Sequence, residues 1–82
     1  MYLAIGKEKW IDSDNLIGIF DLDITSQSHR TRQFLREAEQ SGAVRNAADD
    51  LPKSFAVCRE NGESVVYLSQ MATATLARRI RE

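Results

Sequence analysis

Two aspartates after an apolar run have the spacing that a phosphoryl-transfer site needs. The run Leu16–Phe20 has the β-branched and aromatic residues typical of a strand, and Asp21 and Asp23 follow it. An aspartate at the end of a strand can act as a nucleophile if further carboxylates hold Mg²⁺ and a lysine balances the phosphate charge. The pair Asp49-Asp50 supplies acidic residues further along the chain. These carboxylates are the strongest candidates for catalysis in the sequence.

The segment Phe20-Asp21-Leu22-Asp23-Ile24-Thr25 resembles the first motif of haloacid-dehalogenase-like phosphotransferases, in which the first aspartate attacks phosphorus. That architecture is a parallel sheet of several crossover units, each roughly 30 residues or longer. A chain of 82 residues that also contains a C-terminal hairpin cannot supply these units. We therefore interpret Asp21 and Asp23 as the end of a strand and a polar turn, and we expect no enzymatic activity.

Histidine and cysteine offer little further chemistry. His29 is the only histidine and Cys58 the only cysteine, and they fall in different predicted elements. Neither a histidine-containing metal cluster nor a Cys–His nucleophile therefore has a second candidate. We expect His29 to be solvated in a first helical turn and Cys58 to be an unreactive strand residue. With no glycine-rich phosphate loop among the four glycines, we predict no cofactor and no metal site.

The densest positive cluster is formed by Arg78, Arg79 and Arg81 near the C-terminus. These arginines can contact phosphate if their helix end faces a nucleic-acid groove. They can equally complement the helix macrodipole, which is worth ~0.3–1 kcal/mol without any ligand. A second group of arginines, diluted by nearby glutamates, is adequately explained as a solvated helix face: Arg30, Arg32 and Arg36.

Composition limits the remaining classes of function. The 82 residues (1–82) are expected to form one domain, with 11 Lys and Arg, 12 Asp and Glu and a net charge of −1. Binding to nucleic acid must therefore come from local patches or from assembly. A fold of this size buries only about 60% of its unfolded surface, and a single cysteine offers no disulfide, so we expect a homo-oligomer. The sequence has neither a leader pattern nor an apolar run long enough for a bilayer, which predicts a cytoplasmic protein without membrane contact.

The elements that must position these residues follow from periodicity and turn signals. Predicted strands cover residues 2–5, 10–11, 16–20, 53–59 and 64–68, and predicted helices cover 28–42 and 72–81. The run 16–20 is expected to be a buried central strand, with Gly18 at a bulge or a close approach. The pair Asn61-Gly62 predicts a tight hairpin turn. Ser26 or Ser28 is expected to cap the first helix, Gly42 to end it, and Ser69 to cap the last helix.

The resulting order is strand, strand, strand, helix, strand, strand, helix. This order predicts an α+β fold, with a small, mostly antiparallel sheet and two packed helices. Pro52 closes a loop because it cannot donate to a strand ladder. The residues from Arg45 to Asp50 are expected to be the least ordered part of the chain.

Several segments, in the following order, carry a resemblance that covers almost the whole chain: Tyr2-Leu3-Ala4-Ile5-Gly6, Ile17-Gly18-Ile19-Phe20-Asp21, Thr31-Arg32-Gln33-Phe34-Leu35, Pro52-Lys53-Ser54-Phe55, Val65-Val66-Tyr67-Leu68-Ser69, Thr75-Leu76 and Arg79. They are similar to RemB-like members of the RemA and RemB family of extracellular matrix regulators. The resemblance implies a regulator of biofilm matrix gene expression in bacteria of the Bacillus type. In RemA-like members, rings of subunits contact the DNA backbone through basic surface residues.

The chain departs from the RemA-like pattern where that branch carries arginines. Asn15 and the pair Pro52-Lys53 stand at those places, and only Lys53 keeps a positive charge. The first functional hypothesis is a transcription regulator whose oligomer binds DNA through Lys53 and the C-terminal arginines Arg78, Arg79 and Arg81. The second is an oligomeric interaction module that regulates through a protein partner, such as a related regulator, without touching DNA.

Overall fold

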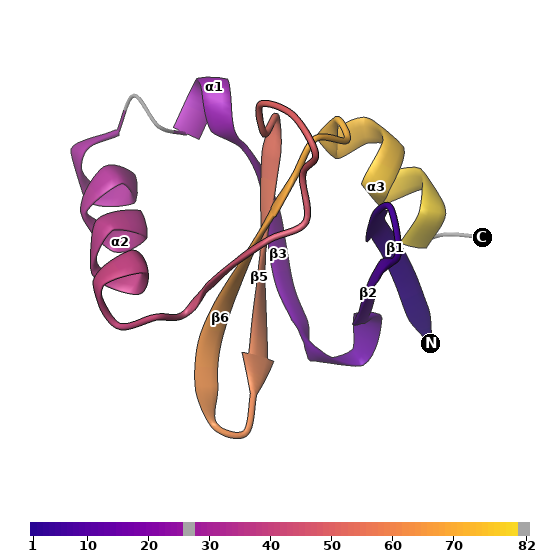
Figure 1. Cartoon of the computed structure of the whole chain (residues 1–82), viewed down its shortest axis with the longest axis horizontal. Helices are drawn as coiled ribbons and strands as arrows, with labels where there is room; N and C mark the ends of the chain where they lie inside the picture. Colours follow the sequence, from indigo (N-terminus) through magenta and orange to yellow (C-terminus); the bar gives the residue numbers. More distant parts are fainter. Residues whose placement is uncertain (26–27, 81–82) are drawn as a thin grey trace.

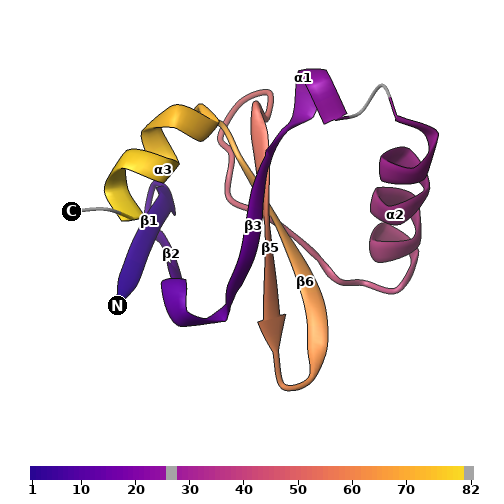
Figure 2. The ribbon, with the colours of Figure 1, turned by 180° about the vertical axis from the view of Figure 1, so that it is seen from behind.

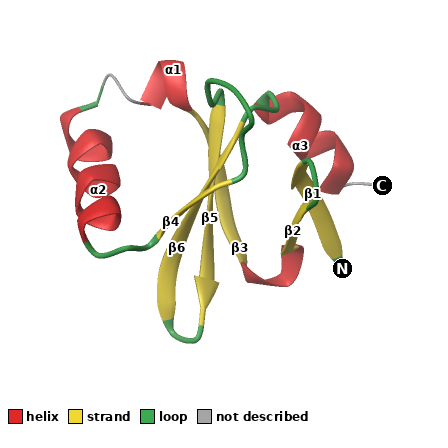
Figure 3. Cartoon of the chain, viewed as in Figure 1, coloured by secondary structure: helices red, strands yellow, loops and turns green. Residues whose placement is uncertain are grey.

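The computed structural model describes residues 1–25 and 28–80, and it has the predicted α+β architecture (Figures 1 and 3). The elements are β1 (Tyr2–Gly6), β2 (Lys9–Asp12), the 3₁₀ turn η1 (Ser13–Asn15), β3 (Leu16–Asp21), α1 (Leu22–Thr25), α2 (His29–Gln40), β4 (Val44–Asn46), β5 (Ser54–Glu60), β6 (Glu63–Ser69) and α3 (Thr73–Ile80). A central sheet lies between α2 on one side and the β1–β2 hairpin with α3 on the other (Figure 1). The order of the predicted strands and helices is confirmed.

The central sheet has the strand order β3-β5-β6-β4. Strand β5 pairs antiparallel with both neighbours, and it is buried from Ser54 to Cys58 because both of its faces are covered. The prediction that Leu16–Phe20 is a buried central strand is wrong, since β3 is an edge strand in which Ile17 is 58% exposed. Its apolar side chains are therefore only partly covered within this chain.

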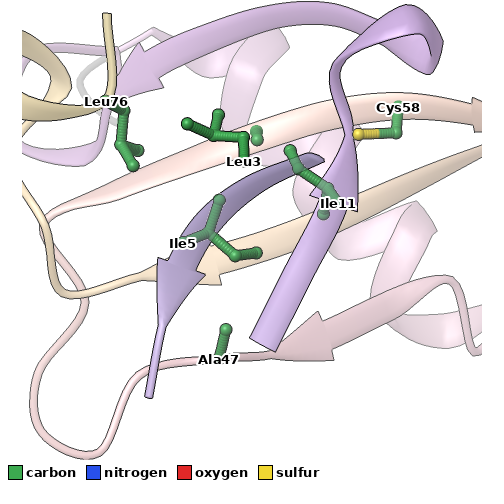
Figure 4. Close-up of a cluster of buried hydrophobic side chains, with 7 residues drawn as sticks. Leu3, Ile5, Ile11, Ala47, Cys58 and Leu76 are labelled. Carbon is green, nitrogen blue, oxygen red and sulfur yellow. The ribbon is translucent and has the colours of Figure 1, made fainter. Parts of the chain in front are cut away.

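The hairpin face of the sheet holds the larger buried cluster (Figure 4). Its buried side chains come from both sheets, the loop after β4 and α3: Leu3, Ile5, Ile11, Ala47, Ala56, Cys58 and Leu76. The buried Ser69 hydroxyl donates to the carbonyl of Ile5 at 2.5 Å and fixes β1 against the end of β6. Gly6 permits a close approach of β1 to the Ala47 backbone, because a Cβ on Gly6 would lie 2.2 Å from the Ala47 carbonyl oxygen.

The α2 face holds a smaller cluster. Its buried members are Phe55, Val57 and Val66, packed against partly buried side chains that include Leu35 and Ala38 of α2. One face of α2 thus packs against the sheet, yet α2 contains no fully buried residue. This helix covers its face of the sheet less completely than the hairpin and α3 cover the other.

Local glycine predictions are confirmed. Asn61 (φ 53°) and Gly62 (φ 82°) have the positive φ values that a tight β5–β6 turn requires, and Gly42 (φ 77°) follows the end of α2. Gly18 lies at the register shift between β3 and β5, as expected for a bulge. A Cβ on Gly18 would also lie 2.9 Å from the Phe20 ring.

Two capping predictions have different outcomes. Ser28 is the N-cap residue of α2, but its side chain makes no capping hydrogen bond, while Ser26 lies outside the described residues. The prediction that Ser69 caps the last helix is wrong. Ser69 ends β6, four residues before α3, and its hydroxyl also accepts a hydrogen bond from the Met71 N–H at 3.1 Å.

The segment from Arg45 to Asp50 is more structured than expected. Strand β4 pairs parallel with β6, and the Ala47 N–H donates to the Leu68 carbonyl oxygen at 2.9 Å. The N–H groups of Asp49 and Asp50 donate to the Gln70 side-chain oxygen at 2.7 and 3.2 Å. These long-range bonds order a segment that has little local signal of its own. Across residues 1–25 and 28–80, no helix is long and apolar enough to cross a membrane.

Candidate functional site

Lys53 presents an exposed side chain on a hydrogen-bonded backbone directly before β5. Its N–H donates to the Ser69 carbonyl at 2.8 Å, and its carbonyl accepts from the Leu22 N–H at 3.0 Å. The backbone of Lys53 is therefore anchored, while its ammonium group stands on a flexible stem that can reach a phosphate.

The C-terminal arginines differ from one another. Arg78 is exposed in the last turn of α3, whereas Arg79 is half-buried. One guanidinium nitrogen of Arg79 donates to the Ala4 carbonyl at 3.1 Å and lies 3.5 Å from the Met71 sulfur. Arg79 therefore ties α3 to β1, and this internal bond restricts the DNA contact predicted for it. Arg81 lies outside the described residues.

The described cations do not form one cluster. Lys53 is bonded to Ser69, just before the chain enters α3, and Arg78 stands in the last turn of that helix. A helix of eight residues is about 12 Å long. The two exposed cations thus lie near opposite ends of α3.

The aspartates form the polar turn that the sequence predicts. The Asp23 N–H donates to the Asp21 carboxylate at 2.8 Å, where β3 passes into α1. The Asp50 carboxylate is likewise used locally, since it accepts from the Leu51 N–H at 2.8 Å. Among the residues that the structure describes, no group of three or more His, Cys, Asp or Glu could hold a metal ion.

The thiol and the phenol of the core are held in their neutral forms. Cys58 is 0% exposed, and burial raises the pKa of its thiol to about 11, with the Glu60 carboxylate adding to the rise. The pKa of Tyr67 is raised to about 12, first by burial of its hydroxyl. The hydrogen bond that this hydroxyl donates to the Glu60 carboxylate at 2.5 Å adds to the rise. His29 is exposed at the start of α2, as predicted. A thiol this strongly protonated is a poor nucleophile.

Sequence reasoning missed an exposed surface on the outer face of the first hairpin. Met1 is 64% exposed, Tyr2 69% and Trp10 63%. Together with Ala4 and Arg79 they line a shallow depression, which we call the hairpin surface. The sequence signal was the alternation in β1 and β2, where Tyr2 and Trp10 alternate with the buried Leu3 and Ile11.

A second exposed apolar surface lies between α2 and the edge strand β3. This groove of about 300 Å³ is lined by Ile17, Phe20, Arg30, Thr31, Phe34, Phe55 and Val57. Its floor includes the stacked rings of Phe20 and Phe55, whose centroids are 5.1 Å apart. Because Gly18 has no side chain, nothing from it displaces the Phe20 ring. The groove is therefore a preformed apolar site with one cationic side chain.

Comparison of the sequence with protein-family models and with curated proteins gave no match.

Proposed function

We propose that this protein is a RemB-like regulatory protein of the extracellular matrix regulator family, acting in the cytoplasm on transcription of biofilm matrix genes. In this role a homo-oligomer contacts the DNA backbone through Lys53 and Arg78. The observation that carries the proposal is that both side chains are exposed, while backbone hydrogen bonds hold Lys53 directly before β5 and Arg78 lies within α3. The resemblance along almost the whole chain supports the choice of family.

Assembly is part of the proposal because one copy offers few phosphate contacts. With a net charge of −1, a single chain has no bulk attraction for DNA. Several linked copies raise the overall affinity without any new type of contact. The two exposed apolar surfaces support such assembly, since large exposed apolar patches commonly mark interaction sites.

A second candidate function is an oligomeric interaction module that acts through a protein partner. The internal bond from Arg79 to Ala4 favours it, because this bond leaves fewer cations for DNA than the sequence indicates. In this alternative Lys53 and Arg78 are ordinary surface charges, and the protein regulates without touching nucleic acid.

A gel-shift titration over a salt series separates the two functions. If each side chain binds a phosphate, Lys53→Glu and Arg78→Glu should each weaken binding to all duplex sequences. Each should also reduce the slope of log affinity against log salt by roughly 0.9 for every phosphate that is no longer neutralised. Arg59→Glu is the matched control, since Arg59 is an exposed cation near the opposite end of β5.

The outcomes are distinct. Uniform weakening by the two test substitutions, with wild-type binding by Arg59→Glu, supports DNA contact at these positions. Absent or salt-insensitive DNA binding by an assembled wild-type protein contradicts the first function and supports the interaction module.

A further inference from the structure

The groove between β3 and α2 is shaped by an irregularity in the edge strand. The pairing of β3 with β5 shifts register between Leu16 and Gly18, so Ile17 is the extra residue of a β-bulge. Strict alternation would send Ile17 to the same face as Ile19, which packs into the hairpin-side cluster. The bulge instead turns Ile17 into the groove beside Phe20. The apolar lining therefore results from a specific feature of the backbone.

The floor of the groove is formed without a ligand. The ring of Phe20 stacks on Phe55 and lies close to Gly18, whose missing side chain leaves it room. Phe55 is buried, while Phe20 and Phe34 remain 38% and 39% exposed. The groove volume of about 300 Å³ lies at the lower end of the range for small-molecule sites. An apolar ligand of small size would therefore cover aromatic surface that this chain leaves in water.

The two polar side chains of the groove lie at one of its ends. Arg30 and Thr31 belong to the first turn of α2, and α2 begins at the end of the sheet where β3 finishes (Figure 2). Ile17 stands roughly 10 Å back along β3 from Phe20, because a strand rises ~3.3 Å per residue. The groove therefore has a polar end beside Phe20 and an apolar end beside Ile17.

The guanidinium of Arg30 is available to a ligand. Within residues 1–25 and 28–80 it makes no ion pair or hydrogen bond. The Asp21 carboxylate, at the end of β3, accepts a hydrogen bond from the Asp23 N–H at 2.8 Å. The first two turns of α2 contain two further arginines and no acidic residue. This charge favours an anionic group on the ligand, and the planar guanidinium matches the two oxygens of a carboxylate.

We propose that the groove binds a small amphipathic carboxylate of the medium-chain fatty acid class. Its carboxylate lies at Arg30, where the Thr31 hydroxyl can donate a further hydrogen bond, and its apolar tail runs between Phe34 and Ile17. The inference is independent of the proposed DNA contact, because the cations assigned to DNA do not line the groove. A ligand in the groove also leaves the hairpin surface free for assembly.

A methyl titration by nuclear magnetic resonance tests the site and its charge separately. Octanoate and 1-octanol have tails of the same length and differ in charge. Either ligand should shift the δ1-methyl signal of Ile17, while the buried methyl groups of Ile5 and Ile11 on the hairpin side should not move. Arg30→Gln should weaken octanoate binding roughly fivefold, as for an exposed ion pair, and should leave 1-octanol binding unchanged.

A neighbouring arginine provides the matched control. Arg32 is exposed, lies two positions further along α2 and does not line the groove. Arg32→Gln should therefore bind both ligands like the wild type. Because Arg30 and Arg32 are both exposed, the buried isoleucine methyl signals of the two variants should match those of the wild type.

Several results would overturn the proposal. An Ile17 signal that ignores millimolar octanoate is one, and equal weakening of octanoate binding by Arg30→Gln and Arg32→Gln is another. Equal loss of both ligands in Arg30→Gln would remove the role of the carboxylate. An Ile17 signal that responds only after dilution to single chains would assign the groove to a second copy. None of these results bears on DNA contact, which the gel-shift titration tests by itself.

Discussion

The two faces of the central sheet are covered to different extents. On the hairpin side, β1, β2 and α3 bury seven of the described side chains in one cluster, and serine and arginine side chains bond across the layers. On the α2 side, three described residues are buried, and the ring of Phe34 remains 39% exposed. The difference shows which side of the sheet this chain buries by itself and which side it leaves partly exposed.

The unevenness has a physical origin in the edge strand. The apolar run of β3 is suited to a strand covered on both faces, yet β3 has β5 as its only neighbour in the sheet. Ile19 packs into the hairpin-side cluster, while Ile17 and Phe20 line the groove. The sequence therefore places apolar side chains at an edge of the sheet that this chain covers only in part.

The comparison is tested most strongly by shortening one leucine on each side. Leu76→Ala should destabilise the protein by ~2–5 kcal/mol, because Leu76 is fully buried in the hairpin-side cluster. Leu35→Ala should cost only about 1 kcal/mol, since Leu35 is partly buried on α2. Urea unfolding of both variants measures the difference. Equal losses would show that the two faces are equally well packed.

Adding one methyl group to a glycine on each side gives the next largest effect. Gly6→Ala should cost ~1–3 kcal/mol, because the new Cβ would meet the Ala47 backbone, which cannot turn away. Gly18→Ala should cost less than about 1 kcal/mol, since its Cβ would meet the movable far end of the Phe20 ring. Thermal unfolding compares the pair, and a greater loss for Gly18→Ala would contradict the open character of the α2 side.

Neighbouring arginines sharpen the comparison between structure and binding. Arg79→Ala should cost about 1 kcal/mol, because it removes the bond from α3 to the Ala4 carbonyl. Arg78→Ala should change stability by less than about 0.5 kcal/mol, since Arg78 is exposed. Its effect should appear in DNA affinity instead. Unfolding and gel-shift titrations of both variants measure the two effects. A loss of stability in Arg78→Ala, with a loss of DNA affinity only in Arg79→Ala, would contradict these roles.

A further effect concerns pH and is confined to the hairpin side. The pKa of Cys58 rises from 9.0 to about 11 on folding, so the folded state favours the neutral thiol. Its contribution is fully present below pH 9 and is lost as the pH rises through about 11. Urea midpoints between these pH values should therefore fall less steeply for Cys58→Ala than for the wild type. Parallel pH profiles would show that the thiol is not desolvated in the fold.

Features that depend on adjacent residues could be predicted from the sequence. The Asn61-Gly62 turn and the left-handed Gly42 follow from the backbone freedom of those residues. Cys58 was expected in a strand as an unreactive thiol, and its burial agrees with that expectation. Each of these features has a cause within a few positions of the chain.

Features that depend on distant partners could not be predicted. Strand β4 has only three residues, and its pairing with β6 supplies the order that its own sequence lacks. The bond from Arg79 to Ala4 joins positions 75 residues apart, so no local pattern distinguishes Arg79 from Arg78. The edge position of β3 likewise depends on strand order. The groove could therefore not be predicted, because its lining residues come from β3, α2 and β5, which are distant in the sequence.

The central claim is the proposed assembly of the protein into a homo-oligomer, and the mass of the wild-type protein in solution tests it most directly. Light scattering at micromolar concentration should give a mass several times that of the 82-residue chain. A mass equal to one chain would contradict the claim, because both apolar surfaces would then remain in water.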